Sequence, residues 1–292
     1  MNQVPVIFGE VLFDCFEDGS RVLGGAPFNV AWHLQGLGFE PLFISRIGSD
    51  AEAEMITTTM EQWGMATAGV QHDPERATGR VTVHLVEGQP EFEIVADCAY
   101  DHIDSSLFPE MEPELIYHGS LGVRQPVSAA ALDHLLQRFP GRAFVDVNLR
   151  SPWWTREQLL RLLQGGRWLK INDQELDLLE AGEGSQSEKV ARLQSRYGPE
   201  WLLLTRGAEG ATLFSQNSDP CHVRPQGTIE VVDTVGAGDA FTAVTIAGLL
   251  RRWPLALTLE RAQQFASRVV AQRGATIADP LVYQKLLQQW AL

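Results

Sequence analysis

Cysteine and basic residues are both scarce in this chain of 292 residues. Its 3 cysteines, Cys15, Cys98 and Cys221, are widely spaced and include no C-x-x-C pair, which indicates reduced thiols in a reducing compartment. Lysine and arginine together number 23 against 37 aspartates and glutamates, so the net charge is −14. A surface this acidic repels phosphate backbones and anionic headgroups, and we expect neither nucleic acid nor a membrane as a partner.

Long apolar runs are also missing. No stretch reaches the ~18 apolar residues that a membrane span needs. The N-terminus has no basic segment, and Glu10 interrupts its first apolar run, so this run is predicted to be a strand rather than a signal peptide. Together with the cysteine usage, this predicts a cytoplasmic protein.

Apolar runs that suit buried strands alternate with helical patterns. The alternation predicts an α/β fold in which helices cover both faces of a mainly parallel sheet. Thr155 with Gln158, and Ser185 with Glu188, are typical capping boxes at two helix starts. No linker divides the chain, so residues 1–292 are predicted to form a single domain. The expected strands are Val4–Phe8, Pro41–Ser45, Leu115–His118, Ala143–Val147, Trp168–Ile171 and Trp201–Thr205, and the expected helices include Pro27–Leu37 and Ala51–Trp63.

Two segments, about 11–23 and 79–96, alternate apolar and polar residues, as Val81, Val83 and Leu85 do. Such alternation is typical of strands with one wet face, so we expect a small antiparallel flap, or lid, attached to the main sheet. Wet strands pair readily with a copy of themselves, and the flap therefore predicts a two-fold homodimer.

The sequence VVDTVGAGDAF, from Val231 to Phe241, precedes a helical run. Gly236 and Gly238 permit a tight turn with uncovered amides, and these amides form an anion site with the dipole of the following helix. Asp239 would repel a merely bound phosphate, but it can accept the proton of a hydroxyl that attacks that phosphate. Taken alone, the stretch is better explained as an ordinary glycine-rich turn with Asp at a helix start.

The longer segment DTVGAGDAF resembles the C-terminal signature of the ribokinase-like (PfkB) carbohydrate kinases. The resemblance implies a three-layer α/β/α sandwich and an ATP-dependent sugar kinase. It also implies that Asp239 is the catalytic base, and that the amides of Gly236, Ala237, Gly238 and Asp239 hold charge on the transferred phosphoryl group.

A second match lies near the N-terminus, where GGAPFNVA begins at Gly24. It resembles the family signature GG-A-x-x-N-x-A, which implies that Gly24 and Gly25 admit the sugar close to the backbone and that Asn29 bonds its hydroxyls. Upstream, Gly9, Glu10 and Asp14 resemble the G-E-x-x-x-D start of fructokinase-like members, and Asp14 would then grip two sugar hydroxyls.

Two motifs resemble the nucleotide side of the family. Asn172 and Glu175 match an N-x-x-E element linked to phosphate and to Mg²⁺, which Glu175 would order through a water, although the same spacing is also a capping pattern. Thr205, Gly207 and Gly210 match a T-x-G-x-x-G turn beside ATP, for which a plain hairpin turn is the alternative.

Asp146, Asn148 and Arg150 resemble the D-x-N-x-R strand end of fructokinase-like kinases, with Val147 in place of the usual proline. Arg150 would either pair with a phosphate oxygen or form a surface salt bridge.

Asp233 and the segment 268–274 match positions that bind a monovalent cation in many family members. The cofactors implied by the resemblance are therefore ATP and Mg²⁺, with K⁺ as an addition. The same resemblance places one wall of the adenine pocket at 262–275.

The acidic flap favours a neutral substrate. It has no lysine or arginine between residues 87 and 104, although Arg80 and Arg124 could still reach the pocket. With the fructokinase-like motifs, fructose is the first candidate, and ribose, 2-keto-3-deoxygluconate and adenosine are alternatives. The carboxylates of this stretch are Glu87, Glu91, Glu93, Asp97, Asp101 and Asp104.

The sequence argues against two other classes of protein. A non-catalytic nucleotide-binding relative would have no need for Asp239 in its anion site. A nicotinamide-dependent oxidoreductase would carry G-x-G-x-x-G directly after the strand Val4–Phe8, where this chain has none.

Overall fold

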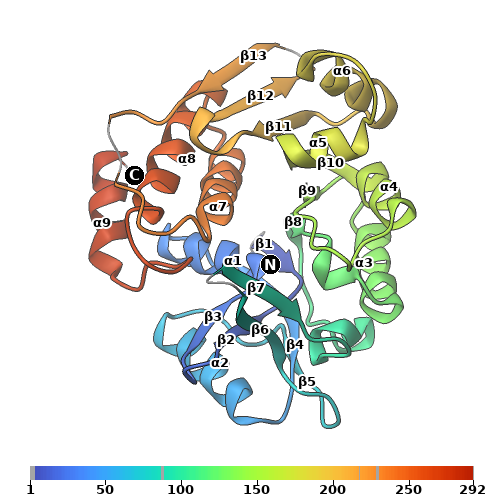
Figure 1. Ribbon diagram of the computed structural model, residues 1–292, viewed down its shortest axis with the longest axis vertical. Helices are drawn as coiled ribbons and strands as arrows, with labels where there is room; N and C mark the ends of the chain where they lie inside the picture. Colours follow the sequence, from blue (N-terminus) through green and yellow to red (C-terminus); the bar gives the residue numbers. More distant parts are fainter. Residues whose placement is uncertain (1–3, 87–88, 217, 228–229, 292) are drawn as a thin grey trace.

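A nine-stranded sheet runs through the computed structural model, which describes all residues except 1–3, 87–88, 217, 228–229 and 292 (Figure 1). Neighbouring strands are parallel, apart from the antiparallel pairs β11–β12 and β12–β13. The mainly parallel sheet is thereby confirmed. In spatial order its strands are β13 (Ser218–Val223), β12 (Ala211–Ser215), β11 (Trp201–Thr205), β10 (Gly166–Asn172), β9 (Ala143–Asp146), β8 (Pro113–His118), β1 (Val4–Phe8), β4 (Leu42–Ile47) and β5 (Val70–His72).

Helices cover both faces of this sheet and complete the three layers (Figure 1). One helix layer buries a single large apolar cluster against the strands, and the other buries two smaller ones. One layer contains α1 (Ala26–Gly36), α2 (Ala51–Gln62), α7 (Ala237–Leu250), α8 (Leu255–Val269) and α9 (Pro280–Gln289), and the other contains α3 (Pro126–Arg138), α4 (Arg156–Gly165), α5 (Asp173–Leu179) and α6 (Gln186–Tyr197). Short 3₁₀ turns are η1 (Ala99–His102), η2 (Ser105–Leu107), η3 (Leu121–Val123) and η4 (Gly207–Glu209).

Local sequence signals account for several element boundaries. Thr155 and Ser185 each cap a helix in the expected capping box, at the starts of α4 and α6. In α4 the buried residues Leu159 and Leu163 lie four positions apart, which places both on the face toward the sheet. Pro27 lies in the first turn of α1, where no N–H is needed.

A separate four-stranded sheet forms the flap, in the order β3-β2-β6-β7. The hairpins β2–β3 and β6–β7 are antiparallel, as predicted. Between the hairpins, however, β2 and β6 are parallel, so the sheet is mixed rather than wholly antiparallel. The reason is topological: β2 follows β1 and β6 follows β5, and those two strands run in the same direction in the main sheet. The flap strands are β2 (Leu12–Phe16), β3 (Arg21–Gly24), β6 (Gly79–Val86) and β7 (Gln89–Ile94).

The two faces of the flap differ in character. Side chains alternate along a strand, and the register places Asp14 beside Val22 and Val81 on one face. On the other face, Arg80 forms an ion pair with Glu52 of α2 at 2.8 Å. That second face is therefore held against the body of the protein, and the face with Asp14 is the one available to a ligand.

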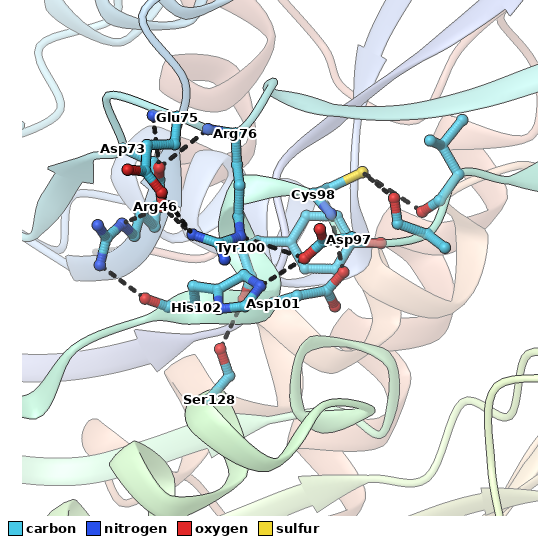
Figure 2. Close-up of polar contacts among 12 residues, drawn as sticks. Arg46, Asp73, Glu75, Arg76, Asp97, Cys98, Tyr100, Asp101, His102 and Ser128 are labelled. Atoms are coloured by element: carbon cyan, nitrogen blue, oxygen red, sulfur yellow. Dashed lines mark hydrogen bonds and ion pairs between the residues drawn. The ribbon is translucent and has the colours of Figure 1, made fainter.

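A polar cluster anchors the base of the flap, where β7 returns to the main sheet (Figure 2). Arg46 on β4 and Asp73 beyond β5 form an ion pair at 3.0 Å. Asp97, just after β7, accepts from Arg76 at 3.1 Å and lies 2.7 Å from His102. These contacts tie both connections of the flap to β4 and η1.

The strand order reverses direction at β1. The chain passes from β1 to β4 on one side, while β8 occupies the other side. In open α/β sheets, such a switch point leaves a crevice at the carboxyl ends of the strands, where ligands bind. The crevice between β1 and β8 is therefore the expected position of the site.

Candidate active site

Helix α7 begins at the glycine-rich turn, on the carboxyl edge of the sheet. Gly236 is its N-cap residue, with φ of 79° in the left-handed region, and a Cβ at this position would overlap Ala275. Only glycine meets both conditions. The amides of Gly238 and Asp239 fall in the first turn and have no intrahelical acceptor, an arrangement that, with the helix dipole, is suited to an anion.

Asp239 is joined to the sugar-side signature by a direct hydrogen bond. The amide Nδ2 of Asn29, on α1, donates to Oδ2 of Asp239 at 2.8 Å. Burial raises the pKa of the Asp239 carboxyl to about 6, and the Asn29 hydrogen bond opposes this rise. A carboxyl with a pKa near neutrality suits a group that must accept a proton.

A buried ion pair lies beneath the turn. Lys170 on β10 donates to both carboxylate oxygens of Asp146 on β9, at 2.9 and 2.7 Å. Thr242 of α7 donates to the same carboxylate at 3.0 Å. The D-x-N-x-R pattern includes Asp146 but no motif includes Lys170, although a lysine inside an apolar buried strand is itself a signal.

The sugar-side residues cluster where β1 meets the flap. Gly25 has φ of 105°, and a Cβ there would lie 2.7 Å from the carbonyl oxygen of Glu10. A Cβ on Gly24 would lie 3.9 Å from Oδ2 of Asp14. Asp14 is half-buried, and burial raises its pKa, which a nearby Arg150 counteracts. Gly24 therefore leaves room beside Asp14, and Gly25 allows the chain to pass close to the backbone of Glu10.

Glu10 is a further acidic group at this position, to which the G-E-x-x-x-D resemblance gives no role of its own. It is 3% exposed, and its Oε2 has no hydrogen-bond partner among the described residues. Burial raises its pKa to about 7, against the opposing charge of Arg150. A buried, unpartnered carboxyl oxygen at the crevice can bond a ligand hydroxyl.

Asn172 and Glu175 form the capping box at the start of α5. The Asn172 Oδ1 accepts from the Glu175 amide at 2.8 Å, and Glu175 Oε2 accepts from the Asn172 amide at 2.8 Å. Glu175 Oε1 accepts from the Leu149 amide at 2.8 Å. The capping alternative is thus correct, and both carboxylate oxygens of Glu175 already have protein donors.

Arg150 comes directly after Leu149, the residue whose amide donates to Glu175. Its guanidinium is exposed and donates to the Leu149 carbonyl at 3.2 Å. Within the described ranges it forms no salt bridge, so that alternative is wrong for the structure as it stands. Burial raises the pKa values of Asp14 and Asp239, and the positive charge of Arg150 opposes this rise at both carboxyls.

The motif with Thr205, Gly207 and Gly210 joins the antiparallel strands β11 and β12. It is therefore a hairpin turn, as the alternative held. Its glycines have φ of 51° and 89°, in the left-handed region. Because Thr205 is the register partner of Asn172, the turn lies on the same carboxyl edge as α5.

Asp233 is engaged by backbone amides. Its Oδ1 accepts from Val235 at 3.0 Å, and its Oδ2 accepts from Gly274 at 3.0 Å. The carboxylate thus ties the segment before α7 to the loop after α8. Across the part of the chain that the structure describes, no group of three or more His, Cys, Asp or Glu is arranged to hold a metal ion.

Comparison with known proteins identifies the relatives of this chain. Residues 15–281 match the model of the pfkB family carbohydrate kinases. A fructokinase from Klebsiella pneumoniae is 30% identical over 304 residues, covering 96% of this chain and 97% of the relative.

Solved structures share the fold. The fructokinase from Xylella fastidiosa with bound ATP has a TM-score of 0.86 at 20% identity, with full coverage of both chains at 100%. The fructokinase from Vibrio cholerae O395, in its fructose, ADP and calcium ion bound form, has a TM-score of 0.85 at 21% identity, covering 98% of this chain and 99% of that one.

Proposed function

Because the chain belongs to the PfkB family, and is therefore an ATP-dependent carbohydrate kinase, we propose that it phosphorylates a hydroxyl of a neutral sugar, with fructose as the first substrate to test. The observation that carries the proposal is the contact between Asn29 and Asp239 at 2.8 Å. It joins the sugar side and the phosphate side of the crevice in one hydrogen bond. A non-catalytic nucleotide-binding protein would have no reason to keep this arrangement.

In the proposed reaction, the sugar hydroxyl oxygen attacks the γ-phosphorus of ATP. A new oxygen–phosphorus bond forms, the bond from that phosphorus to the β–γ bridging oxygen breaks, and its electron pair leaves with ADP. The hydroxyl proton passes to the carboxylate of Asp239. The amides of the turn from Gly236 to Asp239 stabilise negative charge on the transferred group, which is the larger part of catalysis in phosphoryl transfer.

Bound to the nucleotide phosphates, Mg²⁺ would neutralise charge on the leaving group. Glu175 fits a role in orienting a water of that ion, since both of its oxygens are already held in place by backbone amides. Arg150, exposed and unpaired with any described acid, is free to bond a phosphate oxygen. We place the ATP phosphates between these residues and α7, and the hairpin turn after Thr205 beside the nucleotide.

A monovalent cation such as K⁺ would have to bind largely through carbonyl oxygens of the segments around Asp233 and Gly274. The carboxylate of Asp233 orders both segments. Its role in the proposal is therefore to shape the cation loop rather than to act as a ligand.

The contacts of Arg80 and Arg124 bear on whether the substrate is acidic or neutral. Arg124 is buried, and it donates to both oxygens of Asp101 at 2.7 Å each. Arg80 is paired with Glu52 on the far face of the flap. Both cations are therefore already ion-paired with protein carboxylates, while Asp14 adds a carboxylate to the pocket. This supports a neutral polyol and weighs against 2-keto-3-deoxygluconate; ribose and adenosine stay as the alternatives.

Two other acids of the flap segment, Asp97 and Asp101, are already paired with basic groups of the protein. Asp101 is neutralised by Arg124, and Asp97 lies at the base of the flap with Arg76 and His102. Glu87 lies outside the described residues. The carboxylate at the sugar position itself, Asp14, therefore carries the preference for a neutral substrate.

We further propose that the flap closes over the sugar and excludes water from the γ-phosphate.

The flap face with Asp14 also exposes three apolar side chains, Phe16, Val22 and Phe92, at 39%, 42% and 59%. Apolar side chains gathered on a wet sheet face fit a partner surface, which supports a homodimer formed through the flaps. Sedimentation of the wild type and of F92E would test it: a dimer that persists in F92E would remove the support.

The described part of the chain contains no helix long and apolar enough to cross a membrane. The three cysteines are free thiols, and they support our proposal of a reducing, cytoplasmic location.

A coupled assay for ADP release across a panel of sugars tests the function. We expect turnover with fructose and Mg²⁺, and little ATP hydrolysis without sugar. Turnover on ribose or adenosine but not on fructose would correct the substrate, whereas no turnover on any neutral sugar would refute the proposal. Thermal shifts with MgATP and with NAD give an independent check, because only a ligand that binds the folded state raises Tm.

A further inference from the structure

The ion pair between Lys170 and Asp146 lies deep beneath the anion site. Their side chains are 9% and 2% exposed, and the nearest contact is 2.7 Å. The two residues are register partners on neighbouring strands, β10 and β9. Taking two charges out of water costs several kcal/mol per ion, and packed apolar residues often do as well or better at such a position. A pair buried in this place therefore calls for a reason other than stability.

The pair is connected to the turn by α7. Thr242 lies one helical turn after Gly238, and its Oγ1 contacts both Asp146 Oδ2 at 3.0 Å and the Gly238 carbonyl at 2.9 Å. A Cβ built on Gly238 would be 3.5 Å from Nζ of Lys170. The ammonium group thus lies directly under the backbone that holds the phosphoryl group, and the absence of a side chain at 238 leaves it uncovered.

We propose that Lys170 and Asp146 are positioning residues of the kinase reaction, which act as a matched pair of charges: they hold the first turn of α7 and set the electrostatic environment of Asp239. This inference rests on the proposed role of Asp239 as the base. It assigns opposite effects to the two partners, because one carries a positive and the other a negative charge.

The charged and titratable groups that face Asp239 come from several elements. Asp146 raises its pKa, and Lys170 and Arg150 lower it. The ionised Asp239 in turn raises the pKa values of Glu10 and of Tyr117 on β8. Asn29 on α1 supplies the neutral hydrogen bond. Among these groups, only Asp146 and Lys170 are bonded to each other, so either one can be neutralised while the other keeps its charge.

The experiment follows kcat against pH for D146N and K170M. In D146N the uncompensated Lys170 favours the ionised Asp239, and the acid limb of the profile moves to lower pH by roughly half a unit to two units. In K170M two neighbouring carboxyls repel each other when both are ionised, and the limb moves to higher pH by a similar amount. K170M then loses about 1.2- to 10-fold of its kcat at pH 7, depending on the size of the shift, and recovers most of it at pH 9.

A double variant, D146L/K170M, removes both charges and keeps buried volume. Its acid limb returns to within about half a unit of wild type, and this variant also covers the case in which a single replacement fails to fold. Lys189→Met is the matched control: Lys189 forms the same kind of pair with Asp177, at 2.6 Å, on the surface, and its loss leaves the profile unchanged.

Shifts in the same direction for D146N and K170M, or unshifted limbs in folded variants, would overturn the inference and leave a purely structural pair. Failure of the base itself is recognised separately with D239N. If D239N keeps wild-type kcat, the proposed base is wrong; if D239N is inactive and the opposite shifts are missing, only the role of the pair is wrong.

Discussion

Asn29 and Asp239 are separated by 210 positions in the chain and joined by a hydrogen bond of 2.8 Å. The amide lies on α1, the helix that follows Gly24 and Gly25, and the carboxylate lies in the first turn of α7. A sugar bound by Asn29 is thus within reach of the group that takes its proton. Helices α1 and α7 pack against each other in the same layer through a shared apolar core, and this packing brings the two side chains together.

Replacing Asp239 with asparagine removes the proposed base while keeping its size. We expect kcat to fall by roughly 10²- to 10⁴-fold, the usual contribution of general-base catalysis. ATP affinity should be unchanged or higher, because a negative charge near the phosphates has gone. Steady-state kinetics and a direct ATP titration measure both quantities. The control is Asp279→Asn at the start of α9, where asparagine also caps a helix; a D239N protein with wild-type kcat would contradict the mechanism.

The pH dependence of kcat should show an acid limb near pH 6. The pKa of Asp239 is raised to about 6, mainly by burial, and the base works only when ionised. Activity is therefore full well above pH 6 and is lost as the pH falls through that value. A flat profile between pH 5 and 8 would exclude a base with this pKa.

Asn29→Ala should move that limb to higher pH, since the hydrogen bond from Asn29 stabilises the ionised Asp239 and lowers its pKa. We also expect a higher KM for the sugar. Gln35→Ala, further along the same helix, is the control and should change neither quantity. A limb that stays in place in N29A would show that the contact does not influence the base.

Asp14→Ala should raise KM for the sugar far more than KM for ATP. Asp14 lies on the flap face beside Gly24, and α7 with its turn belongs to the main body. The matched control is Asp18→Ala, on the same flap hairpin, whose carboxylate accepts hydrogen bonds from Ser20 of its own turn. Equal increases in both KM values would indicate a folding defect or an incorrect assignment.

Acid should destabilise the fold partly through His33. Its Nδ1 lies 2.8 Å from the Tyr283 hydroxyl and its Nε2 lies 2.9 Å from the Ala275 carbonyl, and burial lowers its pKa to about 4 from 6.5. Below about pH 6.5 the unfolded chain binds a proton that the folded one does not. The free energy of unfolding should therefore decrease by up to about 3 kcal/mol as the pH falls from 6.5 to 4.

His33→Gln can keep both hydrogen bonds and cannot be protonated. Denaturant titrations should show a smaller loss of stability between pH 6.5 and 4 in H33Q than in wild type. His134→Gln, at an exposed position, controls for the loss of an ordinary histidine. Glu10 and Asp239, whose pKa values are raised, contribute in the opposite direction, so the comparison between variants is the decisive one. An H33Q curve parallel to that of wild type would refute the assignment.

The sequence alone determined the fold class and most of the elements of the sheet. The strands Val4–Phe8 and Trp201–Thr205 were predicted with the boundaries that the structure has. The capping boxes at Thr155 and Ser185 were equally readable. Apolar periodicity and capping are local properties, set within a few residues, and the two glycine signatures are short motifs of the same kind. They were therefore available before any tertiary contact was known.

Only the tertiary structure decided which charges meet. Lys170 forms an ion pair with Asp146, and Arg124 with Asp101, although the partners are 24 and 23 positions apart in the chain. The parallel pairing of β2 with β6 depends on the directions in which two distant strands leave the main sheet. Nothing in a local pattern fixes such partners, because burial and the crossing of separate elements create them. Asp239 is an example: the glycine-rich motif singles it out in the sequence, but its pKa depends on burial and on charged neighbours that only the fold brings together.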